Sequence, residues 1–266
     1  MSKSPFSRAE LLPQEERLWV NPSEKRLKVS FAKASTLQER RVAITPEGVK
    51  QLCQLGHEII IQKDLGLHAG FENHFYSEAG AEVTADEKRI FSTPFVVKVD
   101  PFTITEIDKF SSGCTLLSTL QIKTKKKLYF EKLLDKKITA IGLEFIREGT
   151  DHFPFVESLG EISGQSAVHI ASELTTHDDP IRIVYDVIHY GVPNIPSRYP
   201  KTSSIALNEL VVSFLLKLTA KGGLSDGFLN SHELQSGVYT YDGYLTSNLV
   251  ADWFPLPFRN LSLLTL

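Results

Sequence analysis

The chain has few of the features that mark secreted and membrane proteins. Its 266 residues include two cysteines, Cys53 and Cys114, and one methionine. Two cysteines are too few for the disulfide framework of a small secreted domain, so we interpret both as buried, reduced thiols. The apolar runs fall short of the roughly 18 residues that span a membrane, and the N-terminal region has no apolar signal core. We therefore expect a cytoplasmic protein with no membrane as a partner.

An excess of charge of one sign is also missing. The 29 basic and 32 acidic residues give a net charge of −3, which offers no reason to expect nucleic acid as a partner. Lysines do gather between residues 123 and 137, but leucines at helical spacing lie beneath them and acidic residues interrupt them. We favour a solvated helix face there. His177 and His189 lack the paired spacing of metal ligands, so no metal site is predicted.

The chain does have regular alternation of short apolar runs with helical segments. From Lys28 onward, KVSFAKAS, PEGVKQLCQLG and EIIIQKD form a β-α-β pattern. Residues 95–99 and 138–143 are nearly continuous apolar runs, as in parallel strands covered on both faces. The sequence predicts an α/β fold with a doubly wound, mostly parallel sheet. It also predicts a helix over residues 202–221, and a helix stop followed by a loop at GGLSDG, residues 222–227.

Ligands of such sheets bind beyond the carboxyl ends of the strands. The corresponding loops follow Ala34, Val99, Leu120 and Val192. Arg41 precedes a helix that starts with proline, and a guanidinium group can hold a carboxylate through two hydrogen bonds. Lys98 ends an apolar strand, where a charge is costly without a partner or a task. From the residues alone, Arg41 could equally be a surface arginine, and Lys98 could form an ordinary ion pair with Asp100.

Two distant blocks carry a resemblance to a known family. They read RRVAITPEGVKQLCQLGHEIIIQKDLGLHAGF (residues 40–71) and TTHDDP with VIHYGVPNIPSRYPKTSSIAL (residues 175–180 and 187–207). Together they resemble the alanine dehydrogenases and the soluble alpha part of nicotinamide nucleotide transhydrogenases. In that family a Gly-rich, NAD-binding Rossmann domain separates the two blocks. Here they meet between Leu174 and Thr175, with no GxGxxG unit of the required context. We therefore divide the chain into an N-terminal arm (residues 1–27) and one substrate domain in two parts (residues 28–174 and 175–266).

The resemblance implies roles for individual residues. Arg41 occupies the position of the arginine that binds the substrate carboxylate in the family. Lys98 is the candidate for the family's lysine that polarises the keto oxygen and binds the carboxylate. This segment is shorter by one residue than in the family and has one lysine instead of two. Gln121 replaces the histidine that acts as acid and base, and glutamine cannot exchange a proton near neutral pH. Lys98 and Gln121 are the candidate catalytic residues. Asn194 is expected to face substrate and nicotinamide, and Ile195 to form an apolar wall on the cofactor side.

The resulting hypothesis is the substrate domain of an alanine dehydrogenase-like, NAD-dependent oxidoreductase. Its ligand would be a small amino or keto acid such as alanine or pyruvate. Because the NAD domain is missing, we expect neither tight NAD binding nor catalysis. A transhydrogenase-like domain, a non-catalytic small-molecule-binding module and an oligomerisation module stay open, and we expect a homo-oligomer. We further expect Glu144 to form an ion pair with Arg41 or Lys98.

Overall fold

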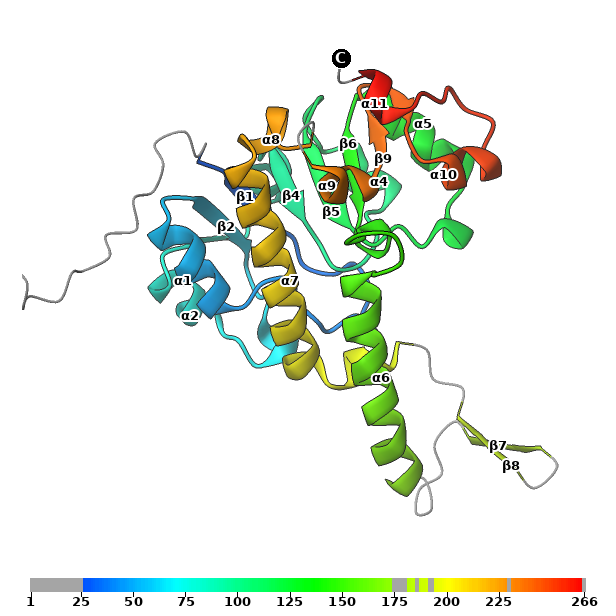
Figure 1. Ribbon diagram of the computed structural model, residues 1–266. Coiled ribbons are helices and arrows are strands. Elements are labelled where there is room, and N and C mark those ends of the chain that lie inside the picture. The colour runs from blue at the N-terminus through cyan, green and yellow to red at the C-terminus, as the bar shows by residue number, and fades with distance from the viewer. Residues whose placement is uncertain (1–25, 174–180, 185–186, 191–193, 229–230, 265–266) are drawn as a thin grey trace, which may run out of the picture.

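The computed structural model describes residues 26–173, 181–184, 187–190, 194–228 and 231–264. An eight-stranded sheet lies at its centre, with helices on both faces (Figure 1). Most of the expected N-terminal arm, the junction between Leu174 and Thr175, and the TTHDDP segment with His177 lie outside the described residues. The side chain of His189 lies outside them as well.

The sheet is mostly parallel, as the sequence predicts. Its six parallel strands are β1 (Lys28–Phe31), β2 (Glu58–Gln62), β3 (Glu82–Thr84), β4 (Phe95–Val97), β5 (Thr115–Ser118) and β6 (Thr139–Gly142). Two antiparallel strands, β9 (Val238–Tyr241) and β10 (Tyr244–Leu245), extend it beyond β6 in the order β10-β9-β6-β5-β4-β1-β2-β3. Strands β4 and β6 are shorter than the apolar runs at residues 95–99 and 138–143, although Val99, Ile138 and Leu143 next to them are buried.

Two hydrophobic cores, one on each face, hold the helices to the sheet. The strands supply both cores because alternate side chains point to opposite faces: Phe95 and Val97 belong to one core and Val96 to the other. The first core takes residues from α1 (Pro46–Gln54), α2 (Asn73–Glu78), α6 (Pro154–Glu173), α7 (Pro200–Ala220), α9 (His232–Ser236) and α11 (Leu261–Leu264). The second takes residues from α3 (Glu87–Phe91), α4 (Ile104–Ile107), α5 (Lys127–Asp135) and α10 (Asn248–Trp253). The fold is therefore doubly wound.

Helix α7 is the main helix of the first core. The sequence predicts a helix over residues 202–221, and α7 starts two residues earlier, at Pro200, and ends one residue earlier, at Ala220. Among the described helices, α7 alone is long and apolar enough to cross a membrane by length and composition. Its side chains of Leu207, Val211 and Leu215 are at most 2% exposed and belong to the first core. The apolar character of α7 is thus accounted for by packing against the sheet.

The contact between α1 and α7 depends on a small residue. Thr45 caps α1 by accepting a hydrogen bond from the amide of Gly48, and Pro46 occupies the first helical position. A Cβ atom on Gly48 would lie 1.9 Å from Oδ1 of Asn208 in α7. That same oxygen accepts a hydrogen bond of 3.0 Å from the amide of Thr45. Glycine therefore lets α7 approach closely enough to fix the start of α1, directly after the loop that carries Arg41.

Three sequence-based expectations were wrong in part. The helix stop after α7 is present, but residues 223–226 form the short helix α8 (Gly223–Asp226) after Gly222, whose φ is 110°, instead of a loop. Cys114 is buried, and burial raises its pKa to about 12, but Cys53 is only partly buried on α1. The lysine run is not a uniform solvated face, because Lys136 donates hydrogen bonds to the carbonyl oxygens of Ile107, Asp108 and Phe110.

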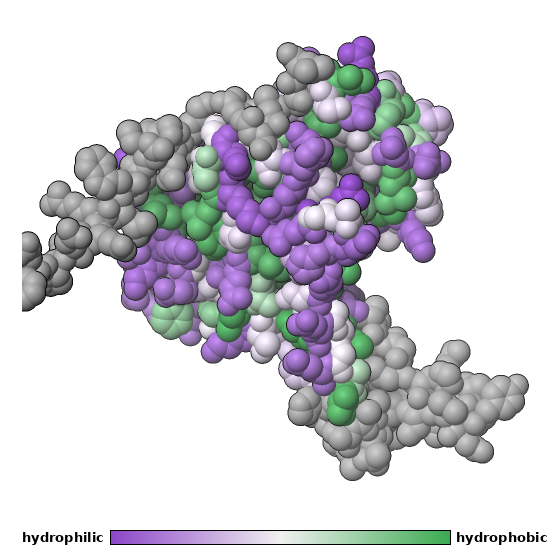
Figure 2. All heavy atoms as spheres, in the orientation of Figure 1, coloured by the Kyte–Doolittle hydropathy of each residue, from purple (hydrophilic) through white to green (hydrophobic). Residues whose placement is uncertain are grey.

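Helix α6 extends away from the sheet, and the antiparallel strands β7 (Ile181–Val184) and β8 (Val187–Tyr190) follow it (Figure 1). Val156 is 49% exposed on this helix and Val168 is 72% exposed. Figure 2 shows apolar side chains near the described end of the projecting helix, whereas hydrophilic side chains cover much of the surface over α7. The described residues between α6 and the 3-10 turn η5 (Ile195–Arg198) form this strand pair alone, without a second parallel sheet.

Candidate functional site

The candidate site lies where the order of the parallel strands reverses. Strand β1 lies beside β4, and the connections from β1 to β2 and from β4 to β5 leave in opposite directions. Open α/β sheets bind ligands in the crevice at such a point, beyond the carboxyl ends of the strands. The loops there are residues 32–45 after β1 and residues 98–103 after β4. They contain Arg41 and Lys98, two of the residues singled out from the sequence.

Arg41 is held by a carboxylate from its own loop. Its Nε donates to Oε1 of Glu39 at 2.8 Å, and its Nη2 donates to Oε2 at 2.6 Å. The backbone amide of Arg41 donates to Oε1 at 3.0 Å, and Nδ2 of Asn194 donates to Oε2 at 3.1 Å. The two side chains are 8% and 5% exposed. The structure thus brings Arg41 and Asn194 together through Glu39, which the sequence analysis did not identify.

The arrangement leaves one edge of the guanidinium group available. Glu39 takes the edge formed by Nε and Nη2, and Nη1 of Arg41 has no hydrogen bond to another described residue. Arg41 lines a cleft of about 380 Å³ together with Ser35 and Glu39 of the same loop. It also lines a small apolar pocket of about 50 Å³ with Thr119 and Glu144. That pocket has room for only a few water-sized groups, so the larger cleft is the one with room for a ligand of Arg41.

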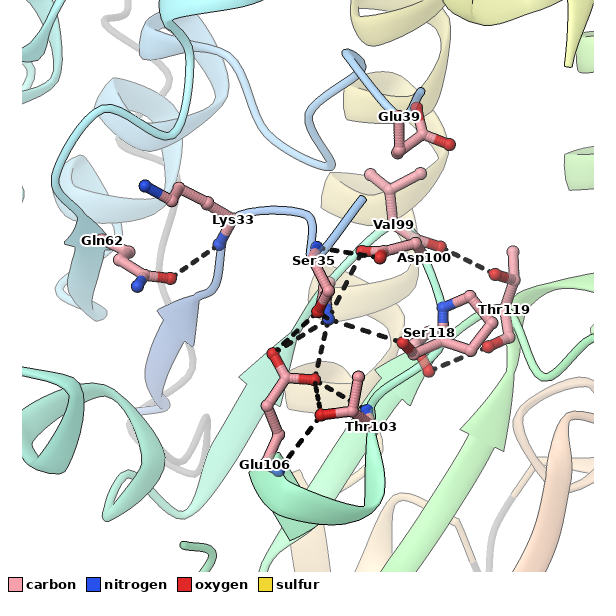
Figure 3. Close-up of polar contacts among 12 residues, drawn as sticks. Lys33, Ser35, Glu39, Gln62, Val99, Asp100, Thr103, Glu106, Ser118 and Thr119 are labelled. Atoms are coloured by element: carbon pink, nitrogen blue, oxygen red, sulfur yellow. Dashed lines mark hydrogen bonds and ion pairs between the residues drawn. The ribbon is translucent and has the colours of Figure 1, made fainter. Parts of the chain in front are cut away.

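Lys98 lies in a different environment from the one expected of a substrate ligand. Its side chain is 0% exposed, and Nζ lies 3.0 Å from both carboxylate oxygens of Glu106 and 3.5 Å from Oδ1 of Asp100. Nζ also donates to Oγ of Ser35. Figure 3 shows Ser35, Asp100, Thr103 and Glu106 turned toward one another in this cluster, while the side chain of Lys33 points away from it. Lys98 therefore fixes the two loops to each other, and its role as a substrate ligand stays a prediction.

The residues around Lys98 explain how a buried charge is tolerated. Glu106 is the third residue of α4 and completes a capping box with Thr103, so its carboxylate is positioned by the helix start. Asp100 binds the backbone amide of Ser35 through Oδ2 at 2.9 Å, whereas its buried Oδ1 has no hydrogen-bond partner among the described groups. Burial raises the pKa of Asp100, and the charge of Lys98 opposes that shift. The ion pair between Lys98 and Asp100, the alternative from the sequence, is present.

Gln121 and Glu144 form a second part of the site. Gln121 follows β5 with φ of 51° and ψ of 58°, the left-handed region that side chains other than glycine seldom adopt. Its backbone amide donates to Oε1 of Glu144 at 2.9 Å, and the amide of Leu120 donates to the same atom at 2.8 Å. The prediction that Glu144 forms an ion pair with Arg41 or Lys98 was wrong, because its carboxylate accepts hydrogen bonds from these backbone amides instead. Gln121 itself is exposed and has no side-chain hydrogen bond within the described structure.

Asn194 and Ile195 begin the turn η5 on the other side of the crevice. Asn194 has φ of 59° and ψ of 50°, so it is a second predicted site residue in the left-handed region. Ser197 of the same turn accepts from the amide of Arg40 at 2.8 Å and donates to the carbonyl oxygen of Gln38 at 2.6 Å. These bonds fix the loop that carries Arg41. Ile195 is partly exposed beside Asn194, and its role as an apolar wall stays a prediction.

Lys125 is a residue whose position the sequence did not predict. It was assigned to a solvated helix face, but it is half-buried, with Nζ 4.9 Å from the centre of the Tyr129 ring. Burial lowers the pKa of Lys125, and the charge of Lys98 acts in the same direction. The carboxylates of Asp100, Glu106 and Glu144 act in the opposite direction. In the sequence, the only signal for the partial burial of Lys125 is its place in the loop after β5, at the carboxyl ends of the strands.

The residues of the crevice do not fit a dinucleotide. A dinucleotide site needs glycines in the first turn from strand to helix, so that the backbone can approach the pyrophosphate. The turn after β1, residues 32–45, contains no glycine. It presents the side chains of Ser35, Glu39 and Arg41 instead. The turn after β1 therefore lacks the close backbone approach that a pyrophosphate requires.

Known proteins match this chain over most of its length. The model described as "Alanine dehydrogenase/PNT, N-terminal domain" matches residues 32–163, and the one for the C-terminal domain matches residues 165–248. Alanine dehydrogenase of Staphylococcus haemolyticus (strain JCSC1435) is 20% identical over 368 aligned positions, which include 88% of this chain and 98% of the relative. The same figures hold for alanine dehydrogenase 2 of Staphylococcus aureus (strain USA300). Since 88% of the 266 residues is about 234, about 134 of the 368 positions (368 minus 234) have no counterpart in this chain.

Two solved structures share the fold. An L-alanine dehydrogenase superposes with a TM-score of 0.76 at 19% identity, covering 86% of this chain and 99% of that one. The transhydrogenase from Sinorhizobium meliloti superposes with a TM-score of 0.67 at 14% identity, covering 83% and 99%. The two family models together match most of the chain, residues 32–163 and 165–248. The chain therefore belongs to the alanine dehydrogenase/PNT family.

Proposed function

We propose that this chain is a binding domain for a small carboxylic acid, an amino or keto acid such as alanine or pyruvate. One observation carries the proposal: Glu39 and Asn194 hold Arg41 so that one edge of its guanidinium group stays open beside a cleft of about 380 Å³. A guanidinium group has five N–H donors in a fixed plane, so it can bind Glu39 along one edge and a ligand carboxylate through Nη1. Glu39 acts as the positioning residue for Arg41.

We further propose that the domain does not transfer hydride by itself. The turn after β1 contains no glycine to approach a pyrophosphate, and Gln121 takes the place of the family's acid–base histidine. In this proposal the cofactor domain of the relatives is absent at the junction of Leu174 and Thr175. The two free cysteines support a location in the reducing cytoplasm. If the domain is transhydrogenase-like instead of alanine dehydrogenase-like, the proposal for this chain is the same. Only the reaction of the intact relative differs.

Isothermal titration calorimetry with alanine, pyruvate and NADH tests both parts. We expect binding of at least one of the two acids and no tight binding of NADH. Arg41→Lys keeps the charge but loses the planar group, so it should weaken acid binding about tenfold or more. Arg147→Lys, at an exposed arginine, is the matched control and should bind like the wild type. If neither acid binds, the proposal of a carboxylate site is wrong. If NADH binds tightly, the proposal that the domain does not transfer hydride by itself is wrong.

A second candidate function is an oligomerisation module, which the projecting helix α6 favours. Val156 and Val168 are exposed along it at 49% and 72%. Burying such side chains against a second copy would remove apolar surface from water. Light scattering coupled to size-exclusion chromatography measures the assembly. A monomer at all accessible concentrations would argue against this function and against the expected homo-oligomer.

A further inference from the structure

The cleft beside Arg41 carries positive charges that the proposed function does not use. It is formed by the loop of residues 33–41 and by the segment from Asp64 to His68. Lys33 and Arg40 line it, both are exposed, and neither has a side-chain hydrogen bond or ion pair to another described residue. The charge of Arg41 is paired with Glu39, so the unpaired charges of the cleft are Lys33, Arg40 and Asp64. Two cations face one anion there.

Asp64 does not neutralise the two cations. Its Oδ1 accepts a hydrogen bond of 2.7 Å from Nδ2 of Asn73, and no basic side chain pairs with it in the described structure. The backbone amide of Lys33 is fixed by Oε1 of Gln62 at 2.8 Å, so the start of the loop is held while the ammonium group remains available. Figure 3 shows that this ammonium group points away from the cluster of Ser35 and Glu106.

We propose that the cleft binds a dicarboxylate: one carboxylate at Nη1 of Arg41 and the second at Lys33 and Arg40. The inference rests on the proposed function, because Arg41 anchors the ligand in both. A three-carbon acid would fill only part of 380 Å³ and would leave both cations unpaired. A second carboxylate pairs with them through charge-assisted hydrogen bonds. The exposed rim side chains Leu37 (85%) and Leu67 (57%) would contact the aliphatic stem between the two carboxylates.

A matched pair of ligands tests the second carboxylate alone. 2-Oxopentanoate and 2-oxoglutarate have the same five-carbon chain and the same keto acid group, and they differ in the distal carboxylate. We expect the dicarboxylate to bind the wild-type domain about tenfold more tightly in calorimetry at low ionic strength. Because the distal contact is partly exposed, the advantage should shrink as salt is raised to about 0.5 M. Equal affinities at low salt would overturn the proposal.

Variants assign the advantage to particular residues. In Lys33→Gln/Arg40→Gln the ratio of the two affinities should fall to about one, because only the distal contact is lost. Lys50→Gln, at an exposed lysine on α1, is the control and should keep the tenfold ratio. An unchanged ratio in the double variant would also overturn the proposal. If neither keto acid binds the wild type, the proposed function itself fails. If 2-oxopentanoate binds and 2-oxoglutarate binds no better, only the dicarboxylate inference fails.

Discussion

Replacing Glu39 by glutamine should destabilise the fold more than any surface charge change, because Glu39 is the partner of a nearly buried arginine. Its carboxylate accepts three hydrogen bonds from Arg41, at 2.6, 2.8 and 3.0 Å, and one from Asn194 at 3.1 Å. Glutamine keeps the shape but replaces one acceptor oxygen by an NH2 group. That group would face N–H donors, and the charge of Arg41 would lose its partner.

The expected loss follows from these contacts. Removing one member of a buried ion pair costs about 3–5 kcal/mol, because the remaining charge stays poorly solvated. Arg41 borders a cleft and its side chain is 8% exposed, so water can partly solvate it. We therefore expect Glu39→Gln to lower the free energy of unfolding by about 2–4 kcal/mol. In a double-mutant cycle with Arg41→Met, the coupling energy should be about 2 kcal/mol or more.

Urea denaturation followed by circular dichroism measures both quantities. Glu58→Gln is the matched control, since Glu58 also pairs with two cations, Lys28 at 2.5 Å and Arg89 at 3.1 Å, but its side chain is 50% exposed. We expect this control to change stability by less than about 1 kcal/mol. A loss below about 1 kcal/mol in Glu39→Gln, or a coupling energy near zero, would refute the view that Glu39 positions Arg41.

Three further predictions concern packing and titration. Gly48→Ala should destabilise by about 1–3 kcal/mol in urea denaturation, because its Cβ would lie 1.9 Å from Oδ1 of Asn208, whereas Gly164→Ala, where nothing lies within 4 Å, should stabilise α6 by about 0.5–1 kcal/mol. A destabilised Gly164→Ala would contradict this. With its pKa raised to about 12, Cys114 should have a thiolate fraction near 10⁻⁴ at pH 8 and resist Ellman's reagent until urea unfolds the domain; prompt native labelling would contradict its burial. Because burial lowers the pKa of Lys125, its reaction with acetic anhydride, followed by mass spectrometry, should rise at lower pH than that of the exposed lysines beside it; a coincident profile would show that it is solvated.

The sequence predicted the fold class and the edge of the sheet where the site lies. Short apolar runs alternating with helical segments specify parallel strands with crossover helices, and such sheets bind ligands beyond their carboxyl ends. Arg41 and Asn194 were predicted from the two sequence blocks, and the structure places both on one carboxylate. The fold class could be predicted because the periodicity of apolar residues follows from local sequence. The roles of Arg41 and Asn194 as substrate ligands rest on the resemblance and stay predictions.

The partners of the charged side chains were decided by the tertiary structure alone. Glu39, which binds Arg41, looks in the sequence like any loop glutamate, and Glu144 binds backbone amides from a neighbouring loop rather than a cation. The charge of Lys98 is tolerated in a fully buried position because Glu106, at the start of the following helix, pairs with it. Pairing of this kind depends on how separate loops converge in space and on how far water is excluded between them. The apolar pattern thus determined the sheet, while the convergence of its loops decided that Glu39 holds Arg41 and leaves Nη1 without a hydrogen bond to another described residue.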